Sequence, residues 1–200
     1  MQCSTSVALL CGGAMSGASA MFTDYELERQ FVDSQCKVVI TDETHIDKVL
    51  LAIQRCPEVQ TIICVRQPRS TRVLPKGVVP WDDVVGSAVT AIPKYNYSAD
   101  DMALLPYSSG TTGSPKGVIL THKNFSTMLS IIDRHFNDYI VGKLGDSDWD
   151  YHDENVLLML PFYHIYGFGL MNQTLINGST GIIFAKFEPI TFFNAIQTYR

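Results

Sequence analysis

YSSGTTGSPKG, residues 107–117, places four hydroxyl residues and two glycines in six consecutive positions, Ser108 to Gly113. Lys116 follows three positions later, and apolar runs flank the stretch at Met102 to Leu105 and at Val118 to Leu120. This pattern predicts a strand, a tight hydroxyl-rich loop and a second strand. Glycines let backbone N–H groups come close to an anion, hydroxyl groups add hydrogen-bond donors, and lysine adds a mobile positive charge. The stretch is therefore a candidate polyphosphate-binding loop.

The loop differs from the P-loop pattern G-x-x-x-x-G-K-[ST], because Gly117 rather than a serine or threonine follows the lysine. A phosphate-binding loop of another type is needed to account for these residues. A polar surface loop without a ligand is the alternative that the local composition leaves open.

The stretch Ser108 to Gly117 resembles the phosphate-binding signature of the adenylate-forming enzymes. These include acyl- and aryl-CoA synthetases, 4-coumarate–CoA ligases, beetle luciferases and the adenylation domains of peptide synthetases. A second stretch, Leu160-Pro-Phe-Tyr-His-Ile-Tyr-Gly-Phe-Gly169, resembles the next signature of the family and follows at the right distance. The segments Gly17–Gln30 and Phe184–Glu188 also resemble the CoA-ligase branch, so the resemblance runs along essentially the whole chain of 200 residues.

This resemblance implies an α/β fold with layered, largely parallel sheets flanked by helices. Residues 1–200 would be a partial AMP-binding (adenylation) domain, an incomplete part of the large N-terminal domain of an adenylate-forming enzyme, with the C-terminal small domain absent. Later signatures of the family, such as a Tyr-Gly-x-Thr-Glu segment and a Thr-Gly-Asp segment, do not occur in the sequence. We therefore expect an interior piece of a larger enzyme.

Hydrophobic periodicity and capping patterns also predict alternating strands and helices, which is typical of α/β layers with a largely parallel sheet. Thr23 and Glu26 form a capping-box pattern at the start of the first expected helix, and Thr121 caps a later one. The expected helices are Thr23 to about Gln35, Glu43–Cys56, Thr121 to about Phe136, Tyr166–Ile176 and Pro189–Arg200, and the expected strands are Lys37–Thr41, Gln60–Val65, Met102–Tyr107, Val156–Leu160 and Ser179–Ala185.

The resemblance further implies roles for the residues of the phosphate loop. Lys116 would neutralise pyrophosphate as it leaves, Gly113 would let the loop turn, and Ser108 would lie near Mg²⁺. The residues implied to hold the β- and γ-phosphates of ATP are Ser108, Ser109, Gly110, Thr111 and Thr112.

The spacing of histidines and cysteines does not match a metal-binding cluster, so no protein-held metal site is expected from these residues.

By the same resemblance, the second signature supplies the acyl side of the site. His164 would lie at the acyl pocket, close to the adenylate phosphate and the path of the thiol, and would be catalytic together with Lys116. Tyr166 would pack on the acyl-adenylate. Lys186 matches a lysine that contacts coenzyme A in aryl-CoA ligases, although Ala185 replaces the proline that precedes it there. Without the resemblance, His164 and Tyr166 are typical of core residues and Lys186 of a solvated surface charge.

The two signatures are expected to meet in space. Each follows a predicted strand, Met102–Tyr107 in one case and Val156–Leu160 in the other. Parallel neighbours would bring the C-terminal ends of these strands together, at the edge where α/β sheets bind ligands. We therefore expect the loop Ser108–Lys116 and the segment His164–Tyr166 to face the same cleft.

The implied activity is that of an ATP-dependent, AMP-forming acyl- or aryl-CoA ligase. A small-molecule carboxylic acid would react with ATP to give an acyl-adenylate and pyrophosphate, and the acyl group would then pass to coenzyme A. ATP, Mg²⁺ and coenzyme A would be the cofactors. The enzyme would act in the cytoplasm or in a peroxisome. Two alternatives remain, namely an adenylating enzyme of luciferase or peptide-synthetase type and a non-catalytic truncated fragment. The isolated chain is expected to be inactive.

Composition narrows the range of partners. A formal net charge of −5 without a basic cluster gives no indication of a nucleic-acid partner, and no partner protein is indicated.

Residues 156–185 carry no charged side chain, but Pro161, Gly167 and Asn172 interrupt the apolar run. This stretch therefore favours a buried strand, loop, helix and strand over a transmembrane span.

Overall fold

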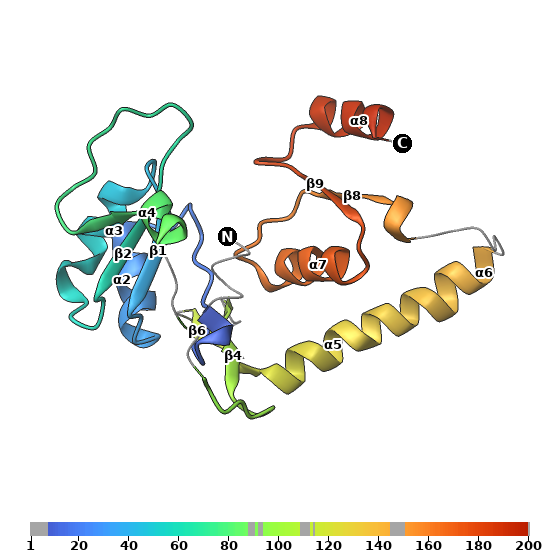
Figure 1. Cartoon of the computed structure of the whole chain (residues 1–200), viewed down its shortest axis with the longest axis horizontal. Helices are drawn as coiled ribbons and strands as arrows, with labels where there is room; N and C mark the ends of the chain where they lie inside the picture. Colours follow the sequence, from blue (N-terminus) through green and yellow to red (C-terminus); the bar gives the residue numbers. More distant parts are fainter. Residues whose placement is uncertain are drawn as a thin grey trace. The chain divides into compact units, whose positions relative to one another are not determined.

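The computed structural model describes residues 8–87, 91, 94–108, 113, 115–144 and 151–199 (Figure 1). The chain divides into two compact units, and each is described by itself. Unit 1 comprises Met1–Gly17, Tyr97–Pro106 and Val118–Arg200, and unit 2 comprises Ala18–Asn96 and Tyr107–Gly117.

Unit 2 is built on a three-stranded sheet in the order β1-β2-β3. Both pairings are parallel, and β1 pairs with β2 over five residues from Val38↔Thr61 to Asp42↔Val65. The described elements of this unit are α2 (Asp24–Asp33), β1 (Val38–Asp42), α3 (Ile46–Ala52), the 3-10 turn η1 (Ile53–Arg55), β2 (Thr61–Val65), β3 (Val78–Pro80), α4 (Trp81–Gly86), β5 (Tyr107–Ser108) and β6 (Lys116–Gly117).

The first helix of unit 2 begins at the expected capping box. The side chain of Thr23 accepts a hydrogen bond from Glu26 N at 3.2 Å, and the carboxylate of Glu26 accepts one from Thr23 N at 2.8 Å. Two backbone donors at the start of α2 are thereby satisfied. The i, i+4 pair Leu27 and Phe31 then lies on the buried face of the helix.

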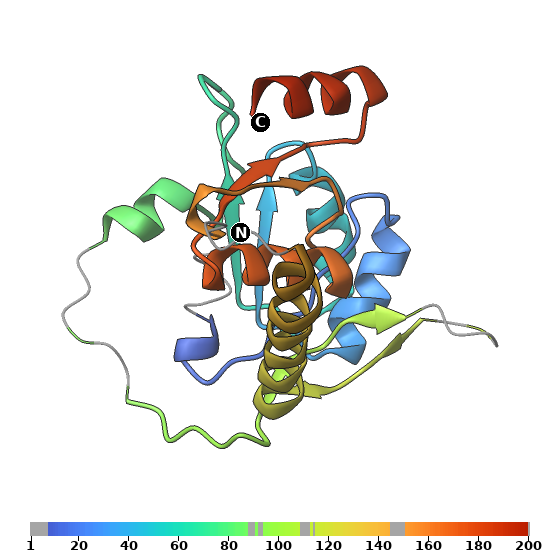
Figure 2. The same cartoon turned by 90° about the vertical axis from the view of Figure 1, so that its right-hand side faces the viewer.

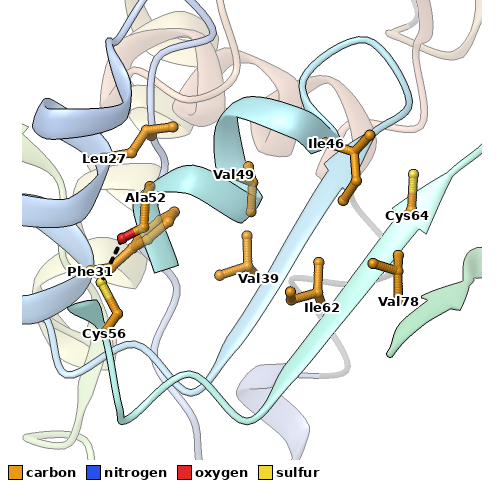
Figure 3. Packing of buried hydrophobic residues seen from close by; sticks show 10 residues of the cluster. All are labelled: Leu27, Phe31, Val39, Ile46, Val49, Ala52, Cys56, Ile62, Cys64 and Val78. Atoms are coloured by element: carbon orange, nitrogen blue, oxygen red, sulfur yellow. Dashed lines mark hydrogen bonds between the residues drawn. The ribbon is translucent and has the colours of Figure 1, made fainter. Parts of the chain in front are cut away.

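The core of unit 2 lies between the sheet and the helices α2 and α3 (Figure 3). Ile46 and Cys64 are fully buried, with none of their surface exposed. Burial of an aliphatic side chain of this size stabilises a fold by about 1.5–3 kcal/mol, so this cluster supplies much of the free energy that holds unit 2 together. Its members are Leu27, Phe31, Val39, Ile46, Val49, Ala52, Cys56, Ile62, Cys64 and Val78.

The strands β5 and β6 form an antiparallel hairpin that also belongs to unit 2 (Figure 2). Each arm contains two residues, and the register pairs Tyr107 with Gly117 and Ser108 with Lys116. The sequence between the arms is the candidate phosphate loop. The hairpin therefore places the two ends of that loop side by side.

Unit 1 contains two separate pairs of strands and its own helices. β4 pairs with β7 in antiparallel orientation, and β8 pairs with β9 in parallel orientation. Residues 8–10 form one helical turn. The further described elements are β4 (Met102–Leu104), β7 (Leu120–Thr121), α5 (His122–His135), the π-helix η2 (Phe136–Val141), α6 (Gly142–Leu144), the 3-10 turn η3 (Tyr151–Asp153), β8 (Asn155–Leu158), α7 (Ile165–Ile176), β9 (Thr180–Ile183) and α8 (Pro189–Thr198).

The buried cluster of unit 1 joins both strand pairs to helix α7. Its buried members are Ala103, Leu104, Leu158, Phe168 and Met171. The N-terminal segment packs against the same region, because Met15 N donates to Ala103 O at 2.9 Å and Leu105 N donates to Met15 O at 2.8 Å. Met15 thus forms a parallel β-bridge with Leu104, on the edge of β4 that does not pair with β7.

Helix α5 also begins at the expected residue. Thr121 is its N-cap and forms a capping box with Asn124, whose side-chain oxygen accepts a hydrogen bond from Thr121 N at 3.0 Å.

Among the residues that the structure describes, none of the helices combines the length and apolar composition that a membrane crossing requires.

The expected α/β architecture is confirmed, but two strand predictions need correction. The expected strand Met102–Tyr107 is divided into β4 and β5, because Pro106 has no N–H to donate to a ladder. The expected direct pairing of this strand with Val156–Leu160 is wrong for the described residues, since β4 pairs with β7 and β8 pairs with β9. Side chains of β4 and β8 nevertheless lie in one hydrophobic cluster.

Candidate functional site

The hairpin β5–β6 presents the ends of the candidate phosphate loop on one face. Ser108 and Lys116 are directly opposite each other in the register, and opposite residues of an antiparallel pair point to the same side of the sheet. Both side chains are exposed. A hydroxyl donor and a cation therefore share one face, which is the arrangement that an anion requires. Ser109, Gly110, Thr111 and Thr112 lie outside the described residues.

Gly113 has the backbone geometry expected of a turning residue in this loop. Its φ of +136° lies where residues with a side chain are strained, and a Cβ at this position would meet no heavy atom of the described residues within 4 Å. This backbone conformation therefore favours glycine at position 113. The role in turning the loop that the resemblance implies for Gly113 stays a prediction.

The residue before the loop makes a contact that the sequence does not predict. Tyr107 donates its hydroxyl hydrogen to the carboxylate of Asp33, with 2.5 Å between the Oη and Oδ2 atoms. Burial, and then the neighbouring carboxylate, raise the pKa of Tyr107 well above its usual range, so the phenol remains the donor and Asp33 the acceptor. The two residues are 74 positions apart, and no local pattern signals their contact.

His164 caps helix α7. Its backbone is extended, with φ −89° and ψ 138°, and its Nδ1 accepts a hydrogen bond from Tyr166 N at 3.2 Å. A neutral imidazole has one donor and one acceptor nitrogen, so this contact assigns the proton of the neutral ring to Nε2. His164 is an exposed residue.

Two glycines allow the close backbone contacts that shape the segment around His164. A Cβ on Gly167 would lie 2.4 Å from Pro161 O, and a Cβ on Gly17 would lie 2.5 Å from Tyr163 O. Both distances are far below van der Waals contact, so any larger residue would force the backbone apart. The conformation of the second signature therefore depends on Gly167 and on a glycine from the N-terminal segment of unit 1.

Tyr166 and His164 are both exposed, Tyr166 by 62%. A small cavity of unit 1 is lined by the sequence neighbours Tyr163 and Ile165 together with Met15, Gly17, Leu104, Pro106 and Phe168, and neither His164 nor Tyr166 is among its lining residues. The prediction that His164 and Tyr166 line one acyl pocket stays a prediction. The same holds for their predicted cleft with Ser108–Lys116, because the two segments belong to different units.

Lys186 follows β9 and lies in a surface ion pair. Its Nζ atom is 2.6 Å from Glu188 Oε1, and the side chains are 78% and 49% exposed. Such an exposed pair contributes at most about 1 kcal/mol, so Lys186 is available to another anion at little energetic cost. Its predicted contact with coenzyme A stays a prediction.

The described residues contain no group of three or more His, Cys, Asp or Glu side chains that could hold a metal ion. The donor set of the hairpin, a hydroxyl and a cation, suits phosphate oxygens better than a bare divalent cation. Any Mg²⁺ near Ser108 would therefore depend largely on oxygen ligands from the nucleotide.

Comparison with known proteins gives one family. The model of the AMP-binding enzyme family matches residues 7–200. Among curated proteins, 4-coumarate–CoA ligase 3 of Arabidopsis thaliana is 31% identical over 197 residues, which cover 96% of this chain and 32% of the relative. Acyl-CoA synthetase 7 of Caenorhabditis elegans is 33% identical over 190 residues, which cover 94% of this chain and 34% of the relative. The chain thus spans about a third of the length of these relatives.

Solved structures show the same fold. A red-emitting luciferase from Phrixothrix hirtus superposes with a TM-score of 0.75 at 23% identity, covering 96% of this chain and 45% of that one. ATP-bound MatB from Rhodopseudomonas palustris gives a TM-score of 0.70 at 22% identity, covering 98% of this chain and 36% of that one.

Proposed function

The chain belongs to the AMP-binding enzyme family, and we propose that it is part of the adenylation domain of an acid–CoA ligase. Such an enzyme joins a carboxylic acid to AMP at the expense of ATP and then transfers the acyl group to coenzyme A. The observation that carries the proposal is the hairpin β5–β6, which presents Ser108 and Lys116 on one face at the ends of the family's phosphate-binding signature. The relatives include 4-coumarate–CoA ligases and an acyl-CoA synthetase, which supports a carboxylic acid as the substrate.

The chemistry requires positioning and charge neutralisation more than a nucleophilic side chain. A carboxylate is a poor acyl donor because its leaving group would be oxide. Its attack on the α-phosphorus of ATP breaks the bond to pyrophosphate and forms a mixed anhydride with AMP. A thiol then attacks the acyl carbon, and AMP leaves. Fixed donors aimed at charge that develops in the transition state are an efficient means of accelerating such steps.

The hairpin residues would act on the first of these steps. Negative charge grows on the bridging oxygen as pyrophosphate leaves, and the ammonium group of Lys116 would meet it. Ser108 would donate its hydroxyl hydrogen to a phosphate oxygen from the same face of the hairpin. Bound Mg²⁺ would supply further neutralisation of phosphate charge. Gly113 would keep the backbone of the loop in the conformation that only glycine adopts without strain.

His164 would serve as a hydrogen-bond donor on the acyl side. Its Nδ1 is engaged with Tyr166 N, so a neutral ring can offer only Nε2–H to an oxygen of the acyl-adenylate. The same contact holds the ring at the end of α7. The side chain thus has a capping role and a donor role, and variants can separate them.

We expect His164→Asn and His164→Ala to differ in stability but not in activity. Asparagine is a strong N-cap, so His164→Asn should retain the stability of α7, whereas His164→Ala should lower it by about 1 kcal/mol. Both variants lose the Nε2–H donor, so both should slow acyl-adenylate formation about tenfold in an enzyme of full family length. Urea unfolding and single-turnover kinetics measure the two effects. Full activity of His164→Ala, which has no side-chain donor, would show that His164 is only a cap.

Acid-dependent exchange of pyrophosphate into ATP tests the proposed function. A protein that continues this chain to the length of its relatives should catalyse exchange with at least one acid from a panel of aromatic and fatty acids. The isolated chain of 200 residues should not, because it matches only about a third of each relative. Absence of exchange with every acid in the longer protein would contradict the proposal and favour a non-catalytic member of the family.

A further inference from the structure

The two faces of the hairpin β5–β6 differ in what they present. Neighbouring residues of a strand point to opposite sides, so Tyr107 lies on the face opposite Ser108. The register places Gly117 across from Tyr107 and Lys116 across from Ser108. One face therefore carries the hydroxyl and the cation, while the other carries a single aromatic side chain opposite a glycine.

That aromatic side chain contacts helix α2. The Tyr107 hydroxyl donates to the Asp33 carboxylate at 2.5 Å, and Asp33 is the last residue of α2. A hydrogen bond to an ionised acceptor is shorter and stronger than one between neutral groups. The C-terminal end of a helix is also the negative end of its dipole, where a carboxylate is unfavourable. Helix stability thus gives no reason for Asp33, whereas its contact with the hairpin does.

The hairpin needs such support because its own pairing is short. Each arm has two residues, and isolated two-stranded hairpins are marginally stable even when they are longer. Without a fixed neighbour, the orientation of Ser108 and Lys116 would fluctuate with the hairpin. A contact on the opposite face can hold the hairpin without covering the face that meets the ligand.

We propose that Asp33 and Tyr107 are positioning residues, which hold the hairpin against α2 and so orient Ser108 and Lys116 toward a bound polyphosphate. The proposal rests on the proposed function, since it assumes that the hairpin binds phosphate groups. Neither residue touches the ligand in this arrangement. Tyr107 acts through the strand that it shares with Ser108, and Asp33 acts through Tyr107.

The first experiment measures the hairpin without any ligand. Tyr107→Phe and Asp33→Asn should each speed hydrogen exchange at the backbone amides of Tyr107, Ser108, Lys116 and Gly117 by about three- to tenfold. Amides of β1 and β2 should keep their wild-type rates, which a general loss of stability would not allow. Tyr25→Phe is the matched control, because Tyr25 lies on the same helix and is 60% exposed. Unchanged exchange in the hairpin of both variants would overturn the proposal.

The second experiment measures binding of inorganic tripolyphosphate to the 200-residue chain by calorimetry. Tyr107→Phe and Asp33→Asn should each weaken binding about three- to tenfold, and the double variant should be no weaker than the single ones, since the two residues act through one contact. Additive losses would contradict a shared role. Lys116→Ala separates this proposal from the proposed function. If Lys116→Ala leaves binding unchanged, or if the wild-type chain does not bind, the phosphate site itself is wrong. If Lys116→Ala weakens binding while Tyr107→Phe and Asp33→Asn do not, only the positioning role is wrong.

Discussion

We expect Lys116→Ala to slow acyl-adenylate formation by about 10²- to 10³-fold in an enzyme that carries this chain at full family length. The ammonium group of Lys116 would meet charge that is larger on the departing pyrophosphate than on bound ATP. Its removal should therefore raise the barrier more than it weakens substrate binding. The affinity for the carboxylic acid should change little. Single-turnover formation of the acyl-adenylate, with acid affinity measured in parallel, checks both parts.

Two matched variants make this experiment specific. Lys76→Ala removes another exposed lysine of unit 2 and should leave the rate unchanged. Lys116→Arg keeps the charge but changes the geometry of its donors, so it should recover part of the lost rate. Equal losses of acid affinity and adenylation rate in Lys116→Ala would instead point to a structural role for the lysine.

We expect Ile46→Ala to destabilise unit 2 by about 2–5 kcal/mol. Ile46 is the first residue of α3, and its fully buried side chain belongs to the cluster between the helices and the parallel sheet (Figure 3). Truncation to alanine removes apolar surface from the core and leaves a cavity that close-packed neighbours fill only in part. A loss of this size is a large share of the total stability of a small domain.

Urea unfolding followed by the fluorescence of Trp81, which begins α4 of unit 2, measures this effect. The other tryptophan of the chain, Trp149, is replaced by phenylalanine in all variants so that the signal comes from unit 2 alone. Leu51→Ala is the control on the same helix, because Leu51 is 56% exposed, and it should cost less than about 1 kcal/mol. Similar losses for the two variants would show that Ile46 does not lie in the core.

Local signals in the sequence predicted much of the fold. Thr23 and Thr121 both cap helices as expected, because a hydroxyl residue followed three positions later by a side-chain acceptor is a local pattern. β3 and α4 were missed, since a strand of three residues directly followed by a short helix gives no clear period. α3 begins at Ile46 instead of Glu43, because the turn after β1 is held by hydrogen bonds from Thr44 N and His45 N to the carboxylate of Asp42.

The candidate site was less accessible to sequence reasoning. A glycine- and hydroxyl-rich stretch between apolar runs predicts a loop, and the structure gives the cross-strand pair Ser108 and Lys116 at its ends. The contact of Tyr107 with Asp33 depends on how distant segments pack, and no spacing rule covers residues that are 74 positions apart. The capping role of His164 was missed for a different reason, because histidine is not among the residues that favour the N-cap position.

The division into two units has a consequence for how the chain is made. Between Gly17 and Val118 the polypeptide passes from one unit to the other four times, and the hairpin β5–β6 is a short insertion between two stretches of unit 1. During translation, unit 2 cannot be completed until Gly117 has left the ribosome. The residues of its buried cluster have already been synthesised when the chain reaches residue 96. The backbone hydrogen bonds of Met15 can form only after Ala103 and Leu105 have been synthesised. A fragment of residues 18–96 would contain the three strands of the parallel sheet but not the hairpin β5–β6, and a nascent chain halted before Tyr107 would expose unfinished surfaces of both units to chaperones.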